Sequence, residues 1–402
     1  MSSHVRSLFW VRGLRAFGDG FVSLLLPLYL LELGLSPFEV GAITAGTLLG
    51  SGVLTLVVGL SAHRFRLRGL LLCATFLMTA TGMGFAVVTN FWPLLLIAVV
   101  GTLNPSSGDV SVFLPLEQTA LAHLAGERNR TALFARYSLV GALVGALGAL
   151  AAGLPGVMVD TAGISLRSAL QLMFGLYGAI GLVATAIYRT LPADFAAGTQ
   201  TPAAPLKESK RVVYILAALF SLDAFGGGFI VQSMLALWLF EKFQLSIGLA
   251  ATIFFWSGVL SAFSYLIAVR IASRFGLINT MVFTHLPASA LLLIMPLMPS
   301  LPWVILLLLV RSALSQMDVP TRSSYVMAVV SPSERAAAAS ITSVPRSLAS
   351  SISPLAAGYL LQVSSFGWPL FFAGILKIVY DLLLLGMFRA VRPPEEESGP
   401  NR

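Results

Sequence analysis

Long apolar runs, separated by short polar segments, follow one another along the whole chain. Twelve runs are bounded by charge, Pro or Gly, and about 20 apolar residues are enough to cross a bilayer as a helix. The first run contains charged residues and no small-residue cleavage site, so we expect a retained span rather than a signal peptide. The pattern predicts an all-α membrane protein with twelve transmembrane helices, at residues 7–31, 39–62, 69–89, 92–117, 131–154, 167–189, 212–240, 247–271, 279–298, 302–326, 336–362 and 367–389.

The composition supports a membrane protein and excludes a soluble one. Of the 402 residues, 57% are hydrophobic and 10% are charged, whereas soluble domains carry about 25% charged residues. The single cysteine, Cys73, excludes an internal disulfide and a cysteine metal cluster. No HExxH, GxSxG or GxxxxGK(S/T) motif occurs. We therefore expect no enzymatic activity, no metal, no cofactor and no direct use of ATP.

The Lys and Arg residues between the runs define an orientation, because cytoplasmic loops are enriched in them. With the N-terminus in the cytoplasm, the outer side holds only Arg167 and Lys242, and the net charge of +8 follows from topology rather than from nucleic-acid binding. We expect a monomeric, multi-pass protein of the cell (inner or plasma) membrane with both termini cytoplasmic. Its partners are then a small-molecule substrate and the lipid bilayer. The cytoplasmic segments hold Arg6, Arg12, Arg64, Arg66, Arg68, Arg128, Arg130, Arg189, Lys207, Lys210, Arg211, Arg270, Arg274, Arg335, Arg389, Arg392 and Arg402.

The chain divides at a polar stretch near its middle. Residues 191–211 are rich in Ala, Pro, Thr and charge and have no apolar periodicity, which is typical of a linker. This stretch separates six runs in residues 1–190 from six runs in residues 212–389, and a polar tail follows at residues 390–402. The division predicts two six-helix bundles joined by a cytoplasmic linker.

The two halves are related by an internal repeat. Residues 16–18 (AFG) recur as residues 224–226, at an offset of 208 positions. Residues 64–65 recur as residues 274–275, residues 109–110 as residues 318–319, and residues 127–128 as residues 334–335, at offsets of 210, 209 and 207. Matches in the same order at a nearly constant offset predict two parallel bundles with pseudo-twofold symmetry.

This repeat and one loop motif resemble the major facilitator superfamily along nearly the whole chain. The family signature between its second and third helices is roughly G-x-x-x-D-R-x-G-R-R, and here residues 59–68 read GLSAHRFRLR. His63 stands where the family has an acid that helps to hold one gating state. The alternative to a gating role is that the basic residues of this loop, Arg64, Arg66 and Arg68, only anchor it at the cytoplasmic membrane surface. The resemblance implies a gating role for Gly59, His63, Arg64, Arg68 and, in the repeat, Arg274.

Ionisable residues inside the runs are informative, because each costs from about 2.5 kcal/mol upwards in a bilayer. Arg15 and Asp19 are spaced for pairing on one helix face. The family resemblance implies that most of the helices carrying buried charge line a central cavity. The alternative is an internal ion-pair cluster that only holds the halves together. The predicted solute or proton pathway is Arg15, Asp19, Asn104, Asp109, Asp223, Gln232, Gln316, Asp318, Arg322 and Arg346.

Helix-breaking residues and isolated polar residues complete this prediction. The segment Thr102–Asp109 interrupts its helix and exposes backbone groups that require a cavity, and the glycines at 226–228 permit bending before Gln232. Lys377 and Asp381 lie one turn apart, so we expect them to neutralise each other. We expect a structural role for His285.

The resemblance implies a secondary transporter that works by alternating access. A carboxylate in a cavity can change protonation during the cycle, and the chain resembles the compact bacterial exporters of the family. This resemblance implies proton-coupled efflux, by antiport, of drug-like or toxic small organic solutes. The alternative is proton-coupled uptake or facilitated transport of an organic anion or sugar. Cavity arginines suit an anion, whereas cavity aspartates suit a cation or a proton. An intramembrane enzyme or a scaffold is a remote alternative.

Overall fold

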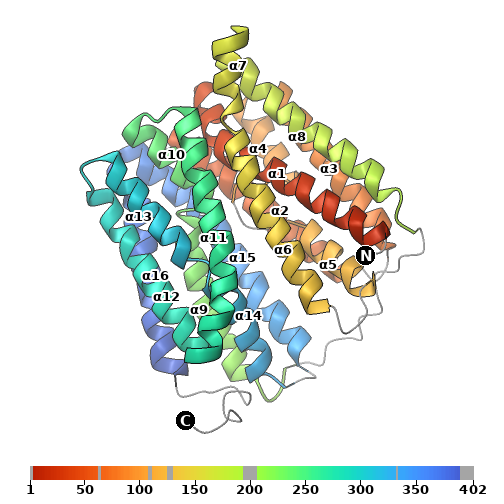
Figure 1. Ribbon diagram of the computed structural model, residues 1–402, viewed down its shortest axis with the longest axis vertical. Helices are drawn as coiled ribbons and strands as arrows, with labels where there is room; N and C mark the ends of the chain where they lie inside the picture. The colour runs from red at the N-terminus through yellow and green to blue at the C-terminus, as the bar shows by residue number, and fades with distance from the viewer. Residues whose placement is uncertain are drawn as a thin grey trace. The chain divides into compact units, whose positions relative to one another are not determined.

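The computed structural model describes residues 3–61, 65–106, 111–124, 130–192, 206–331 and 334–389, and helices make up most of these ranges (Figure 1). In chain order they are α1 (Ser3–Glu32), α2 (Pro37–Ser61), α3 (Leu67–Val87), α4 (Phe91–Val100), α5 (Phe113–Leu124), α6 (Arg130–Ala151), α7 (Leu154–Ala162), α8 (Leu166–Tyr188), α9 (Lys210–Gly228), α10 (Gln232–Phe243), α11 (Ile247–Phe275), α12 (Leu277–Ile294), the 3-10 helix η3 (Met295–Leu297), α13 (Leu301–Leu314), α14 (Asp318–Val329), α15 (Arg335–Val363) and α16 (Trp368–Phe388).

The expected spans occur in the expected order, which confirms the all-α class. Ten helical segments of the described chain are long and apolar enough to cross a membrane. Three expected spans are interrupted: 92–117 contains α4 and α5, 212–240 contains α9 and α10, and 302–326 contains α13 and α14. The expected span at 336–362 is α15, which carries many serines and is correspondingly less apolar.

Close contacts divide the chain into two compact units. The first contains Met1–Gln200, Val231–Gly258 and Pro354–Ser365, and the second contains Thr201–Ile230, Val259–Ser353 and Phe366–Arg402. Thus α10 belongs to the first unit, and α11 and α15 contribute to both. The expected division into residues 1–190, 191–211, 212–389 and 390–402 stays a prediction.

Two of the helix breaks satisfy each other inside the first unit. The backbone N–H of Ser233, at the start of α10, donates to the carbonyl oxygen of Pro105 at 3.1 Å. The first N–H groups of a helix have no intrahelical partner, and Pro105 lies in the non-helical break between α4 and α5. Lipid would offer neither group a partner. Gln232 Nε2 also donates to Ser23 Oγ of α1 at 2.9 Å. The broken backbone is therefore held by protein contacts rather than by lipid.

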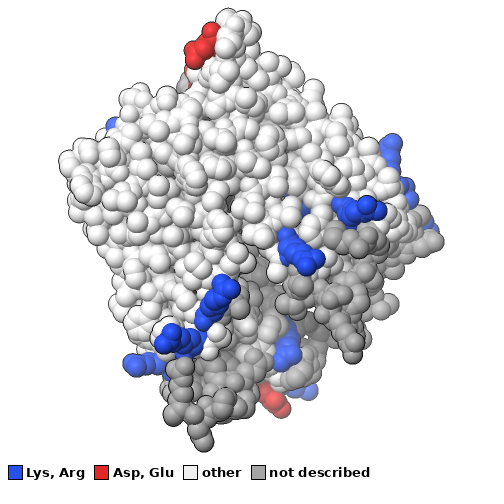
Figure 2. Space-filling view, viewed as in Figure 1, with Lys and Arg blue, Asp and Glu red and all other residues white. Residues whose placement is uncertain are grey.

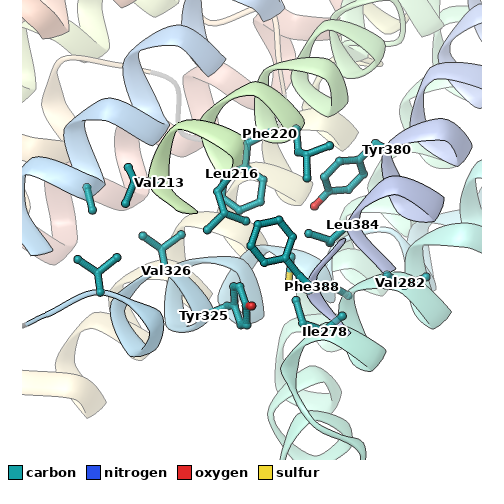
Figure 3. Close-up of a cluster of buried hydrophobic side chains, with 14 residues drawn as sticks. Val213, Leu216, Phe220, Ile278, Val282, Tyr325, Val326, Tyr380, Leu384 and Phe388 are labelled. Atoms are coloured by element: carbon teal, nitrogen blue, oxygen red, sulfur yellow. The ribbon is translucent and has the colours of Figure 1, made fainter. Parts of the chain in front are cut away.

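An apolar cluster packs α9, α12, α14 and α16 of the second unit together (Figure 3), and Ala338 of α15 also belongs to it. Phe220 of α9, Val282 of α12, Tyr325 of α14 and Leu384 of α16 belong to it and are almost fully buried. Because this packing fixes the four helices, it also fixes the polar side chains that they carry nearby.

The outer surface suits a lipid environment. On the face drawn in Figure 2, most of the described area is uncharged. Trp92, Trp303 and Trp368 stand at the starts of α4, α13 and α16 and are 75%, 55% and 39% exposed. Exposed tryptophans at helix ends are typical of the membrane–water interface.

Gly20 provides a test of the packing in the first unit. A Cβ atom there would lie 2.1 Å from the carbonyl oxygen of Gly145 in α6, so Gly20→Ala must push α1 away from α6. We expect a loss of about 1–3 kcal/mol in the free energy of unfolding, seen as a lower Tm in detergent. Gly175→Ala is the control, because nothing lies within 4 Å of a Cβ at that position. Equal Tm values for the two variants would contradict the close approach.

Candidate functional site

The Asp223 carboxylate is the centre of a buried charge network in the second unit. Asp223 lies on α9 and is 4% exposed. Its Oδ1 accepts a hydrogen bond from Lys377 Nζ of α16 at 2.7 Å, and its Oδ2 accepts one from Arg322 Nη2 of α14 at 2.9 Å. A buried carboxylate without such partners is strongly destabilising. One side chain therefore joins three helices.

Arg322 is held on several sides. It also pairs with Asp318, one turn earlier on α14. Its guanidinium carbon lies 5.2 Å from the centre of the Phe220 ring and 6.0 Å from that of Tyr380, which belong to the apolar cluster. Such contacts stabilise a cation that has left water. The Arg322 guanidinium is therefore bound by two carboxylates and two aromatic rings of the protein.

His285 of α12 lies between two carboxylates. Its Nδ1 is 3.0 Å from Asp381 Oδ1 of α16, and its Nε2 is 3.7 Å from Asp223 Oδ1. Imidazole is the side chain whose charge changes most readily near neutral pH. The second unit thus contains a proton-accepting ring in contact with a set of fixed charges.

The first unit contains a second buried network, around Glu117 of α5. Glu117 is fully buried and accepts hydrogen bonds from Arg15 of α1, Tyr137 of α6 and Tyr188 of α8. The Arg15 guanidinium carbon lies 4.1 Å from the centre of the Phe113 ring. Four helices meet at this carboxylate.

The two networks repeat the same connection with opposite charges. In the first unit, Arg15 of α1 binds Glu117 of α5. In the second unit, Asp223, at the repeat position of Arg15, binds Arg322 of α14. The first pair joins α1 to α5, which is the second segment of the interrupted fourth span. The second pair joins α9 to α14, which is the second segment of the corresponding span in the other half.

Other predicted pathway residues make more local contacts. The Tyr177 hydroxyl of α8 lies 3.5 Å from Asp19 Oδ1 and 3.0 Å from the Thr102 carbonyl oxygen. Asn104 Oδ1 accepts from the backbone N–H and hydroxyl of Ser106 at 3.1 and 2.9 Å, which shapes the break after α4.

Gln316 and Arg346 lie in the second unit. Gln316 Oε1, between α13 and α14, accepts from the Tyr265 hydroxyl of α11 at 3.0 Å. Arg346 is exposed and forms no hydrogen bond or ion pair with any residue that the structure describes. Of the predicted pathway arginines, Arg15 and Arg322 are thus paired and Arg346 is not.

The structure describes only some of the residues for which the sequence predicts a gating role. Asp109 of the pathway set, and His63 and Arg64 of the gating set, lie outside the described residues. Gly59 lies on α2, Arg68 on α3 and Arg274 in the last turn of α11. Their gating role stays a prediction.

The structure corrects the expected Lys377–Asp381 pair. Lys377 donates to Asp223, and Asp381 contacts His285, so neighbours on one helix have partners on two other helices.

The structural role expected for His285 overlooked both carboxylates, which lie far away in the sequence. Glu117 was not predicted either, although a carboxylate at the end of the apolar run 92–117 was a signal that could have marked it.

A further carboxylate, Glu334, binds the N-terminal end of α9. Its oxygens accept hydrogen bonds from the backbone N–H groups of Lys207, Glu208 and Ser209 at 2.6, 3.1 and 3.1 Å. Anions are favoured at helix N-termini because the donors there lack partners. These bonds, above all that from Lys207, lower the pKa of Glu334 from 4.5 to about 2.

The helices and their networks define a polytopic α-helical membrane protein. The sequence pattern of the Major Facilitator Superfamily matches residues 8–246 and 217–402. The chain belongs to this superfamily, has its fold, and is a transporter rather than an enzyme.

Similar proteins of known sequence or structure agree with this assignment. The chain is 24% identical to the uncharacterized membrane protein YJR124C of Saccharomyces cerevisiae, over 94% of this chain and 92% of that one. A mutant of the nucleoside transporter NupG has a TM-score of 0.78 at 14% identity, covering 96% of this chain and 100% of that one. The xylose transporter XylE of E. coli has a TM-score of 0.73 at 14% identity, with both chains fully covered. The structural likeness concerns the fold.

The Glu117 network predicts a large effect of one substitution. Glu117→Gln leaves the buried Arg15 without its counter-charge, so we expect a loss of about 3–5 kcal/mol in stability. Thermal unfolding in detergent measures it, and Glu241→Gln, at an exposed carboxylate, should leave Tm unchanged. The double variant Arg15→Met/Glu117→Met should recover part of the loss. A wild-type Tm for Glu117→Gln would contradict the network.

Glu334 predicts a defined pH dependence. Because its pKa is lowered, its contribution to stability is fully present above pH 4.5 and is lost as the pH falls through about 2. The wild type should therefore exceed Glu334→Gln in Tm at pH 7, and the difference should shrink between pH 4.5 and 2. A difference that stays constant over this range would show that the carboxylate charge does not stabilise α9.

Proposed function

We propose that the protein is a secondary active transporter that couples the movement of a small organic solute to protons, in the direction of export. It works as a monomer in the cell membrane with both termini in the cytoplasm, and a proton gradient takes the place of a cofactor. Export is retained from the resemblance to the compact bacterial exporters of the family, and uptake is an alternative outcome of the assay below.

The observation that carries proton coupling is the position of His285 between Asp381 and Asp223. The network in direct contact contains three carboxylates (Asp223, Asp318 and Asp381) and two basic side chains, Arg322 and Lys377. The imidazole of His285 lies among these groups, and imidazole is the side chain that most readily takes up or releases a proton.

Protonation of His285 is linked to helix contacts. Asp223 holds α9 to α14 and α16, and His285 approaches the same oxygen that accepts from Lys377. A proton on the ring strengthens the attraction to Asp223 and Asp381, and its loss weakens it. The protonation state therefore changes how firmly α9 and α12 are joined, which is the type of change that biases a conformational equilibrium.

The test is transport in proteoliposomes across a panel of solutes, with and without an imposed pH gradient. The wild type should move solute against its gradient only while the pH gradient is present, and vesicles of known protein orientation report the direction. Solute flux that is unchanged when the pH gradient collapses would refute proton coupling.

Two network variants assign the coupling group. His285→Gln and Asp381→Asn should retain solute exchange but lose gradient-driven transport, because the proton site is removed while Asp223 keeps both cations. Asp160→Asn, at an exposed residue of α7, is the control and should behave as the wild type. If both network variants fold and couple normally, the coupling site lies elsewhere; Asp223→Asn and Asp19→Asn then test the remaining carboxylates.

A further inference from the structure

One face of α15 is polar along a helix of membrane-spanning length. Ser340, Ser343, Arg346, Ser347 and Ser350 recur at intervals of three or four residues or lie next to one another, so they share a face. The first three are exposed and the last two are half-buried. We call these five residues the serine stripe.

The opposite face of α15 is apolar. Ile352 lies nine residues after Ser343, which is two and a half turns, so the two residues point in opposite directions. Ile352 is 60% exposed and Tyr359, two turns further on, is 58% exposed. An exposed apolar face suits lipid, and the serine stripe then faces away from lipid, where water can reach it.

Arg346 places a full positive charge on the stripe at membrane depth. It lies 11 residues from the start of α15 and 17 from its end, close to the middle of the helix. A guanidinium facing lipid there would be expensive. The hydroxyls of Ser343 and Ser350 donate to carbonyl oxygens of their own helix, at 3.3 and 2.9 Å, whereas a guanidinium offers five N–H donors.

The nearby carboxylates do not neutralise Arg346 by contact. Asp223, Asp318 and Asp381 already bind Lys377, Arg322 and His285, and the strongest electrostatic neighbour of Arg346 is another guanidinium, that of Arg322. Asp223 and Asp318 act on Arg346 only from a distance, and among the described residues none forms an ion pair with its guanidinium, whose N–H groups are then available as donors. Such donors attract an anion, and the planar guanidinium suits a carboxylate or phosphate group.

We propose that the serine stripe of α15 lines the solute pathway and that Arg346 binds the anionic group of the solute, a small organic molecule that carries a carboxylate or phosphate. The inference rests on the proposed transport function and names its substrate class. It concerns the residue that recognises charge, whereas the proposed function concerns the residues that carry the proton.

Thiol labelling tests the site without knowledge of the solute. The only native cysteine is replaced (Cys73→Ser), and Ser343→Cys is introduced one turn before Arg346 in the full-length protein in membrane vesicles. The probes are two membrane-impermeant reagents, the anionic sulfonatoethyl methanethiosulfonate and the cationic trimethylammonioethyl methanethiosulfonate. Relative to their rates with a free thiol, the anionic reagent should react faster by on the order of tenfold.

Matched variants connect this preference to Arg346. Adding Arg346→Gln should remove most of the anionic preference, and Arg346→Lys should retain it. Ile352→Cys, on the apolar face of the same helix, should react with neither reagent. Each variant is used only if it purifies as a single species with a Tm near that of its parent. No labelling at position 343, or a preference that survives Arg346→Gln, would overturn the proposal.

Transport supplies the second readout. Solutes that the wild type moves should carry a carboxylate or phosphate, and Arg346→Gln should lose their transport. Transport of an uncharged solute at the wild-type rate by Arg346→Gln would also overturn the proposal. The labelling result does not depend on proton coupling. A failure of proton coupling at His285 can therefore be told apart from a failure of anion binding at Arg346.

Discussion

A charge inside a membrane protein must find its counter-charge within the protein, and the Asp223 carboxylate shows how much structure follows from that constraint. Its two oxygens bind Lys377 of α16 and Arg322 of α14, and His285 of α12 lies 3.7 Å away. The apolar cluster of Figure 3 packs the same four helices and shields the charges from solvent. Since removal of one partner would leave an uncompensated charge, the positions of these helices and the ionisation of the network depend on each other.

The same constraint applies to the backbone. Unpaired N–H and carbonyl groups are as intolerable in lipid as unpaired charges, yet α4, α9 and α13 all end inside their spans. The hydrogen bond from the Ser233 N–H to the Pro105 carbonyl oxygen shows one solution, in which one broken helix satisfies another. Breaks of this kind bring polar groups to membrane depth at low cost, and they occur in the same spans as the buried charges.

Residue types at membrane depth could be predicted from the sequence, but their partners could not. Asp223, Asp318 and Arg322 were identified because a charge within an apolar run is conspicuous. Lys377 was assigned to Asp381, its neighbour on the helix, whereas it binds Asp223, 154 residues away. Local spacing favours pairs on one helix, while the geometry of packed helices offers shorter contacts across the bundle.

The sequence by itself indicated a lipid environment and the order of the apolar spans, because apolar run length is a property of the chain alone, and its internal repeat and one loop motif resembled the superfamily. Only the tertiary structure decided which charges are neutralised. It paired Arg15 with Glu117, placed His285 between two carboxylates and left Arg346 without a hydrogen bond or ion pair among the described residues. A charge is a local fact, whereas its availability to a proton or a solute depends on what the packed helices bring within a few ångströms of it.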